Sequence, residues 1–311
     1  MSFDPTEEDS IKSFFDEYGF VVVREVYDED ACDRTVDAMW EVCEELNPGL
    51  CRNDVSTWNA LKASGKYGLS SRGPCFHSQL VRNRQSPRLA RVLEVLIESE
   101  VLVSQDRFTI YRSTMLGGPG VATGPRNVHL DLNPWWWLES AEEVTAGVDT
   151  LQYENEQDFI KENNLVVKSM GRHVQCVLNF MDNVEADGGT IVVPKFHRYI
   201  AHWCEEHKTL KKPIPWLTMP PDTPLLSLAQ RIPMKRGSVL LWDQTMFHGT
   251  SPNQSANCRA AQYLKAFPVS CVSAERLTRR SCALKRILEE KNFLDDITPS
   301  GLSVFALKGI L

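Results

Sequence analysis

The chain has 311 residues, of which 42% are hydrophobic and 24% charged, and these are the proportions of an ordinary folded protein. Its 34 basic and 41 acidic residues give a formal net charge of −7, and no block of Lys and Arg is long enough to follow a phosphate backbone. This argues against nucleic acid as a partner. No apolar run approaches the ~20 residues of a membrane span, and the first ten residues do not look like a secretion signal. The nine cysteines are scattered without a CxxC pair, so we expect reduced thiols and a cytoplasmic protein.

The first hundred residues are predicted to be mainly helical. Asp4-Pro5 and Ser86-Pro87 are typical helix starts, because a side-chain cap is followed by a proline whose missing N–H costs nothing in the first turn. The run FVVVREV is rich in β-branched residues and predicts a strand. In chain order we predict a helix over 4–18, a strand over 20–26, a helix from 28 to Pro48, a loop over 49–84 and a helix over 86–97.

From residue 101 onward short strands dominate the pattern. They are predicted at 101–111, 127–132, 173–181, 189–194, 237–243 and 259–267. Such even spacing favours an antiparallel barrel or jelly roll, with helices before and after it. Insertions are expected at 135–172 and 199–236, and an amphipathic helix at about 273–294 should pack on the barrel. We therefore expect a single domain over 1–311, with N-terminal helices in 1–100 and a core at about 101–270.

His129 and Asp131 form the first candidate site. Residues i and i+2 of a strand point to the same side, so this imidazole and carboxylate can share one cation. Two His and one carboxylate form the facial triad that suits Fe(II) and oxygen chemistry, so the pair needs a second His from elsewhere. The pair by itself is weak evidence, because short motifs of this kind also arise by chance.

A second candidate region follows the strand at 237–243. His248 lies in a predicted connection, among polar turn residues, where a packing role is less expected than in an apolar run. Arg259 begins the next strand, and an Arg that points into a barrel needs an anion, since an unpaired buried guanidinium is costly. A bound dicarboxylate would meet that need.

Four separated motifs resemble the phytanoyl-CoA dioxygenase-like family of Fe(II)- and 2-oxoglutarate-dependent oxygenases. They are FFDEYGFVVVREVYDEDACDRTVDAM, the His129-Leu130-Asp131 triplet, DGGTIVVPKFHR and RGSVLLWDQTMFHGTSPNQSANCRAA. The third departs from the family pattern, because Lys195-Phe196 stand where that pattern has Gly-Ser. The matches run in the right order from about residue 10 to 270.

The resemblance implies an α+β fold, with a double-stranded β-helix core (jelly-roll, cupin-like) and flanking N- and C-terminal helices. It also implies that His129, Asp131 and His248 bind Fe(II), and that Arg259, joined by the Thr250 hydroxyl, binds the far carboxylate of 2-oxoglutarate. The expected reaction uses O2 to hydroxylate, desaturate or cyclise a small-molecule substrate at a C–H bond, with release of succinate and CO2. The presence of Asp131 argues against halogenation, because halogenases of this type leave the carboxylate position to chloride.

Other residues have weaker predictions. Gln175 and Asn179 share one strand face and are candidates to reach the co-substrate or substrate, while His173, His202 and His207 are expected to be structural or at the surface. His197 matches the third motif but is not expected to bind metal.

The stretch that follows the metal pair carries two further predictions. Trp135-Trp136-Trp137, interpreted as β-structure, would put its first and third rings on one face, and one of the three rings is a candidate for the substrate pocket. The acidic segment at 135–164 is predicted to be a mobile lid with few buried residues, whose charge favours a substrate amine.

Two other function classes stay open from the sequence. The same barrel could hold a different metal and act as a lyase, isomerase or hydrolase, with Arg259 binding the substrate. It could also be a binding module without catalysis, although the intact triad together with Arg259 argues against that. The substrate itself, the outcome of the reaction and the oligomeric state do not follow from the sequence.

Overall fold

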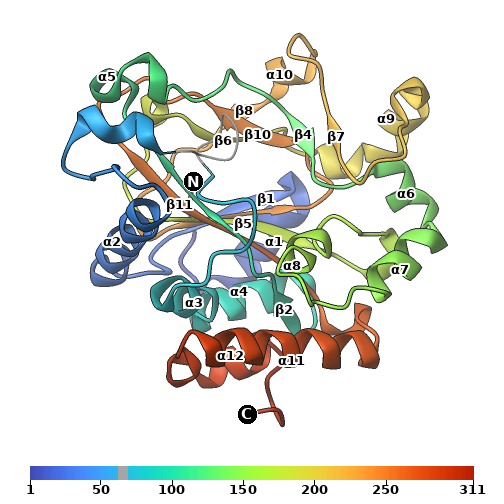
Figure 1. The fold of residues 1–311 in the computed structure, drawn as a ribbon. Helices are drawn as coiled ribbons and strands as arrows, with labels where there is room; N and C mark the ends of the chain where they lie inside the picture. Colours follow the sequence, from blue (N-terminus) through green and yellow to red (C-terminus); the bar gives the residue numbers. More distant parts are fainter. Residues whose placement is uncertain (62–68) are drawn as a thin grey trace.

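Two antiparallel sheets lie face to face at the centre of the computed structural model, which describes residues 1–61 and 69–311 (Figure 1). The larger sheet has the strand order β1-β9-β5-β11-β2, with β3 also paired to β11, and the smaller one has the order β7-β4-β10-β6-β8. The strands of the larger sheet are β1 (Phe20–Val23), β2 (Val101–Val103), β3 (Phe108–Tyr111), β5 (Val174–Asn179), β9 (Val239–Asp243) and β11 (Arg259–Pro268). Those of the smaller sheet are β4 (His129–Leu130), β6 (Gly189–Val192), β7 (Leu217–Thr218), β8 (Gln230–Arg231) and β10 (His248–Ser251).

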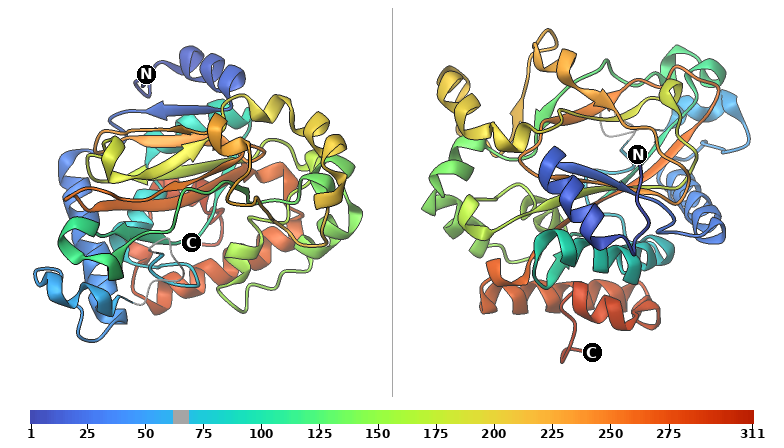
Figure 2. Two further views of the ribbon diagram at one scale, coloured as in Figure 1. Left: turned by 90° about the horizontal axis from the view of Figure 1, so that it is seen from above. Right: turned by 180° about the vertical axis from the view of Figure 1, so that it is seen from behind.

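Helices from both ends of the chain cover the outer face of the larger sheet (Figures 1 and 2). They are α1 (Glu8–Tyr18), α2 (Glu29–Leu46), α3 (Ser78–Arg84), α4 (Pro87–Ile97), α11 (Ala274–Glu290) and α12 (Pro299–Val304). The intervening segments carry α5 (Thr114–Gly117), α6 (Pro134–Glu139), α7 (Glu142–Asp149), α8 (Asp158–Lys161), α9 (Ile200–Glu206) and α10 (Leu225–Leu228). Short 3-10 turns are η1 (Val55–Ala60), η2 (Pro119–Val121), η3 (Lys168–Met170), η4 (Glu185–Asp187), η5 (Phe196–Arg198), η6 (Lys208–Leu210), η7 (Val269–Cys271) and η8 (Leu294–Asp296).

The larger sheet separates two hydrophobic cores, and β9 illustrates how. Val239 and Leu241 belong to the core between the sheet and the helices, whereas Leu240 and Trp242 belong to the core between the two sheets. Alternate side chains of a strand point to opposite faces, and here both faces are buried, so the strand is a continuous apolar run. The predicted α+β fold with a double-stranded β-helix core and flanking helices is confirmed.

Several predicted boundaries in the N-terminal part are wrong. The first helix begins at Glu8, because the Asp4 carboxylate accepts the Thr6 N–H and forms a turn instead of a cap. The first strand ends at Val23 and pairs with β9, so the larger sheet includes a strand from outside the predicted core of 101–270. The predicted loop at 49–84 contains η1 and α3, and its residues 62–68 lie outside the described part of the chain.

The largest corrections concern the residues around the candidate site. His248 does not lie in a connection but begins β10, which pairs with both β4 and β6. The tryptophan run is helical, because Asn133 caps α6 by accepting the N–H groups of Trp135 and Trp136, and Pro134 occupies the first turn. Local capping therefore overrides the β propensity of the three aromatic residues.

The insertion at 135–172 is packed more firmly than its composition predicts. Val144, Val148, Tyr153 and Phe159 are buried in the core that also contains the outer helices, and Glu162 is buried as well. The premise of the lid prediction, that 135–164 has little burial, is therefore wrong. Among the helices of the described residues, none has the length and apolar character to cross a bilayer.

Candidate metal and ligand site

His129, Asp131 and His248 meet at the adjoining ends of β4 and β10. His129 and His248 are register partners on the two strands, and their ring centroids are 4.4 Å apart. His129 Nε2 lies 3.5 Å from Asp131 Oδ1, and His248 Nε2 lies 3.7 Å from Asp131 Oδ2. One ligand atom from each residue lies within 4.8 Å of the others, which is close enough for a single metal ion.

The backbone at this point depends on Gly249, the residue after His248. A Cβ atom on Gly249 would overlap the carbonyl oxygen of Asn127, two residues before His129. The strands β10 and β4 therefore approach closely because this position has no side chain. Leu130, between His129 and Asp131, does not line the cavity but is fully buried in a hydrophobic cluster, which holds this segment in place.

The His248 ring is oriented by its surroundings. Its Nδ1 lies 3.0 Å from the Met246 carbonyl oxygen, and its centroid is 5.0 Å from that of Trp242. Because a carbonyl only accepts, this contact requires the proton on Nδ1, which leaves the lone pair of Nε2 available to a cation.

The protonation states also suit metal binding. Burial, reinforced by His248, lowers the pKa of His129 to about 4, so the ring is neutral at physiological pH. Burial by itself would raise the pKa of Asp131, but the Lys265 ammonium and the two histidines hold it well below its usual range. The three residues thus offer two imidazoles and one carboxylate to a cation.

Asp131 has two donors on one of its oxygens. Gln175 Nε2 donates to Asp131 Oδ2 at 2.7 Å, and Lys265 Nζ lies 3.2 Å from the same atom. Trp242 Nε1 donates to Gln175 Oε1 at 3.1 Å, which fixes the orientation of the amide. Gln175 therefore reaches the carboxylate of the triad.

Arg259 is buried in the same region. Its guanidinium carbon lies 3.9 Å from the centroid of the Tyr111 ring, and its Nε and Nη1 have no hydrogen-bond partner within the described ranges. A Cβ on Gly189 would overlap Nη1, so β6, a strand of the smaller sheet, is also shaped around this side chain. A buried cation with unused donors is a receptor for an anion.

One cavity of about 400 Å³ joins the triad to Arg259. All six predicted site residues line it, namely His129, Asp131, Gln175, His248, Thr250 and Arg259. Its volume lies within the range of small-molecule sites. Residues that the sequence analysis did not assign to the site also line the cavity, among them Arg107, Ile160, Asn163, Asn164, Trp216 and Lys265.

Several other candidates lie elsewhere. Asn179 donates to the Met181 and Lys235 carbonyl oxygens, and His197 contacts the Asp16 carbonyl oxygen. His173 is buried and stacked on Phe267, which fits the predicted structural role. The aromatic residues at the cavity are Tyr111, Trp216, Trp242 and Tyr263, and among the described residues that line it there is no member of the tryptophan run.

Comparisons with known proteins point to one family. The family model described as phytanoyl-CoA dioxygenase (PhyH) matches residues 15–261. A Dictyostelium discoideum protein named "Putative phytanoyl-CoA dioxygenase" is 34% identical over 299 residues, which cover 93% of this chain and 84% of that protein.

Solved structures share the fold at much lower identity. A hypothetical protein from Escherichia coli has a TM-score of 0.64 at 14% identity, with 98% of this chain and 84% of that one covered. The epimerase SnoN, solved with Fe3+, alpha-ketoglutarate and a nogalamycin compound, has a TM-score of 0.54 at 14% identity, with 85% of each chain covered. The family match and the Dictyostelium relative show that this chain belongs to the phytanoyl-CoA dioxygenase family of dioxygenase-type oxidoreductases.

Proposed function

We propose that the protein is an oxygenase that uses Fe(II) and 2-oxoglutarate to oxidise a C–H bond of a small molecule, with release of succinate and CO2. The observation that carries the proposal is the meeting of two different receptors in one cavity. A set of two imidazoles and one carboxylate lies at one part of its wall, and a buried arginine with unused donors lies at another. SnoN, which has the same fold, was solved with Fe3+ and alpha-ketoglutarate.

The donor set fits Fe(II). Two histidines and one carboxylate leave coordination positions open for other ligands, which is the arrangement typical of non-haem iron oxygenases. In this role His129, Asp131 and His248 are the iron ligands, and the hydrogen bond of His248 to the Met246 carbonyl keeps its Nε2 directed at the metal.

The arginine fits the far carboxylate of 2-oxoglutarate. The guanidinium of Arg259 offers a planar pair of donors that matches a carboxylate, and Thr250 lines the same cavity with a hydroxyl group. Bound iron and 2-oxoglutarate would supply the activation of O2 and the oxidation of the substrate. The protein residues then orient the co-substrate between Arg259 and the triad and restrict the access of water.

The substrate is proposed to be a small molecule that occupies the rest of the cavity, near Trp216 and the wall formed by Ile160, Asn163 and Asn164. That wall offers two neutral amides and an apolar side chain. Because the residues of the insertion that line the cavity are uncharged, they do not support the predicted preference for a substrate amine. We also propose a cytoplasmic location, in keeping with nine cysteines that are all free.

The test is an anaerobic titration of the Fe(II)-loaded protein with 2-oxoglutarate. We expect a weak visible charge-transfer band from the chelated co-substrate, and its loss in a His248→Ala variant. A metal-dependent lyase, isomerase or hydrolase would bind the metal without this band, and a binding module would do neither. Absence of the band in protein that retains iron would therefore reject the proposal.

A further inference from the structure

The Asp131 carboxylate is held asymmetrically. Its Oδ2 receives Gln175 Nε2 at 2.7 Å and the Lys265 ammonium at 3.2 Å and lies 3.7 Å from His248 Nε2, whereas Oδ1 faces His129 Nε2 at 3.5 Å. Two donors on one oxygen restrict rotation of the carboxylate and so fix how its oxygens face the two histidines. Such outer contacts orient metal ligands and tune their strength.

Residues of the insertion at 135–172 hold the Lys265 side chain in place. Its side chain is 8% exposed, and its Nζ donates to the Asn163 carbonyl oxygen at 3.3 Å and to Asn164 Oδ1 at 3.1 Å. Together with Asp131, these acceptors account for the three hydrogens of the ammonium. Gln244 Nε2 also donates to the Asn163 carbonyl at 2.7 Å, so the backbone of the insertion is tied to the larger sheet at this point.

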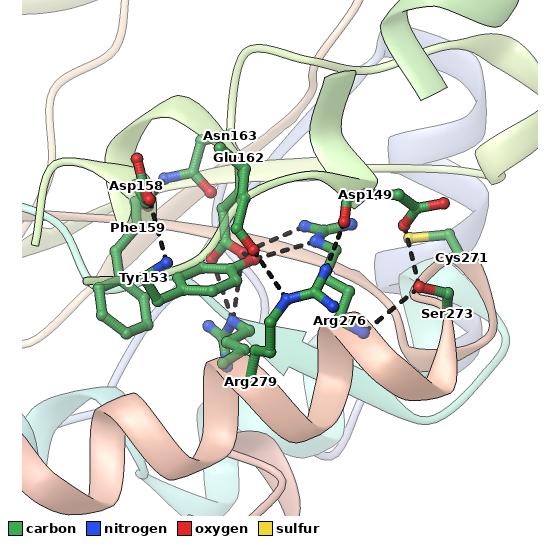
Figure 3. A network of polar contacts seen from close by, with 12 residues as sticks. Asp149, Tyr153, Asp158, Phe159, Glu162, Asn163, Cys271, Ser273, Arg276 and Arg279 are labelled. Atoms are coloured by element: carbon green, nitrogen blue, oxygen red, sulfur yellow. Dashed lines mark hydrogen bonds and ion pairs between the residues drawn. The ribbon is translucent and has the colours of Figure 1, made fainter. Parts of the chain in front are cut away.

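The residue before this pair, Glu162, anchors the insertion to the C-terminal helix α11 (Figure 3). Its fully buried carboxylate lies 3.1 Å from Arg276 Nη2 and 3.1 Å from Arg280 Nε, and it accepts the Tyr153 hydroxyl at 2.7 Å. Arg280 also donates to the Val103 carbonyl oxygen on β2 at 2.7 Å. A buried carboxylate with two cations and a hydroxyl is satisfied only in this arrangement, so it fixes the insertion relative to α11.

We propose that Lys265 is a positioning residue for Asp131, and that α11 keeps Lys265 in place through Glu162 and the adjoining Asn163 and Asn164. The inference rests on the proposed role of Asp131 as a metal ligand. Lys265 and α11 both follow residue 261, where the family match ends, so the inference concerns a part of the chain that the family model does not describe. The C-terminal helix thus serves the metal site as well as the fold.

The first experiment replaces Lys265 by Met, which keeps the length of the side chain but removes the charge and the donors. The full-length protein is stripped of metal and titrated with Co(II), whose visible absorption reports its coordination. We expect the Kd for Co(II) to rise roughly tenfold, as for other residues that orient metal ligands, and the absorption spectrum to change. The Lys265→Arg variant keeps a charged donor and should recover part of the affinity.

A different result for Lys265→Met would contradict the positioning role. If Lys265 only contributed charge, its removal would relieve repulsion of the metal, and Co(II) would bind as tightly or more tightly with an unchanged spectrum. That outcome would overturn the inference. Failure of this inference can be distinguished from failure of the proposed function. If wild-type protein binds Co(II) but forms no 2-oxoglutarate chelate with Fe(II), the oxygenase function is refuted and the positioning role of Lys265 is not.

The second experiment tests whether Glu162 and Asn164 hold Lys265 in place, with the variants Glu162→Gln and Asn164→Leu. Asn164→Leu removes an acceptor of Lys265 and should raise the Kd for Co(II) several-fold. Because Asn164 is partly exposed, this variant keeps the test valid even if Glu162→Gln does not fold. The control is Asp296→Asn, which removes an ion pair with Arg82 that links η8 to α3, away from the cavity. We expect the control to lower Tm without altering Co(II) binding, and equal Co(II) binding in all these variants would overturn the role of the anchor.

Discussion

At the level of single residues, the proposed binding of 2-oxoglutarate depends on the shape of Arg259 as well as on its charge. Arg259→Lys keeps a cation but loses the planar pair of donors and the stacking on Tyr111. A charge-assisted hydrogen bond contributes about 1.5–3 kcal/mol, so the apparent affinity for 2-oxoglutarate should fall roughly ten- to a hundredfold. Measurement of succinate against 2-oxoglutarate concentration gives this value, and Co(II) binding should stay at the wild-type level. An unchanged 2-oxoglutarate dependence would assign Arg259 to the substrate or to the fold.

His173 predicts a pH dependence of stability that is separate from the metal site. Burial lowers the pKa of this ring to about 3, whereas in the unfolded chain it is about 6.5. Between these values the unfolded state binds more protons, so the free energy of unfolding falls as the pH drops, by on the order of 2–3 kcal/mol between pH 7 and 4. His173→Phe keeps a ring against Phe267 and should remove this part of the slope in urea unfolding curves. The same slope in both proteins would show that other groups cause it.

At the level of elements, the metal site requires the close approach of β10 and β4. Gly249→Ala would drive a Cβ atom into the Asn127 carbonyl and separate the two strands, which carry His248 and His129. We expect a Tm lower by several degrees, since even ~1 kcal/mol shifts Tm by a few degrees in a chain of this size, and a large loss of Co(II) affinity. Gly147→Ala is the matched control, because nothing lies within 4 Å of a Cβ there and alanine favours the helix α7. Wild-type Co(II) binding in Gly249→Ala would disprove this account of the backbone.

At the level of the whole molecule, the ion-pair network of Glu162 joins segments more than a hundred residues apart. Arg280→Met should destabilise the protein by about 3 kcal/mol, because the buried Glu162 carboxylate would then have Arg276 as its remaining ionic partner. The triple variant Glu162→Met/Arg276→Met/Arg280→Met removes all three buried charges and should be more stable than the single variant, as measured by urea unfolding. A triple variant that is less stable than the single one would mean that the ion pairs stabilise the fold more than apolar side chains in their place.

The same network bears on the predicted lid. Because Glu162, Tyr153 and Phe159 are buried, the amides of 153–163 should exchange hydrogen about as slowly as those of the sheet, with or without ligand. Rapid exchange in the free protein, followed by protection when substrate binds, would instead support closure of this segment. Hydrogen exchange of the anaerobic Fe(II)–2-oxoglutarate complex separates the two outcomes.

The sequence by itself determined the fold class and the set of candidate site residues. Short alternating runs and turn residues act locally, so β5, β6, β9 and β11 and the helices at 28–47 and 86–97 lie close to their predicted positions, whereas the short strands β7, β8 and β10 are not predicted. The positions of His129, Asp131, His248 and Arg259 followed from spacing and from a resemblance whose motifs are contiguous in the chain. These features depend on neighbours in sequence, and therefore the sequence is sufficient to find them.

What only the tertiary structure decided is the set of contacts between distant segments. The strand at His248 forms because β4 and β6 offer partners on both sides, and the acidic insertion is buried because α11 supplies Arg276 and Arg280. The placement of Lys265 beside Asp131 likewise arises because β11 of the larger sheet meets the segment that follows β4 of the smaller sheet. Burial and ion pairing depend on which surfaces meet in three dimensions, and no local pattern around Glu162 or Lys265 carries that information.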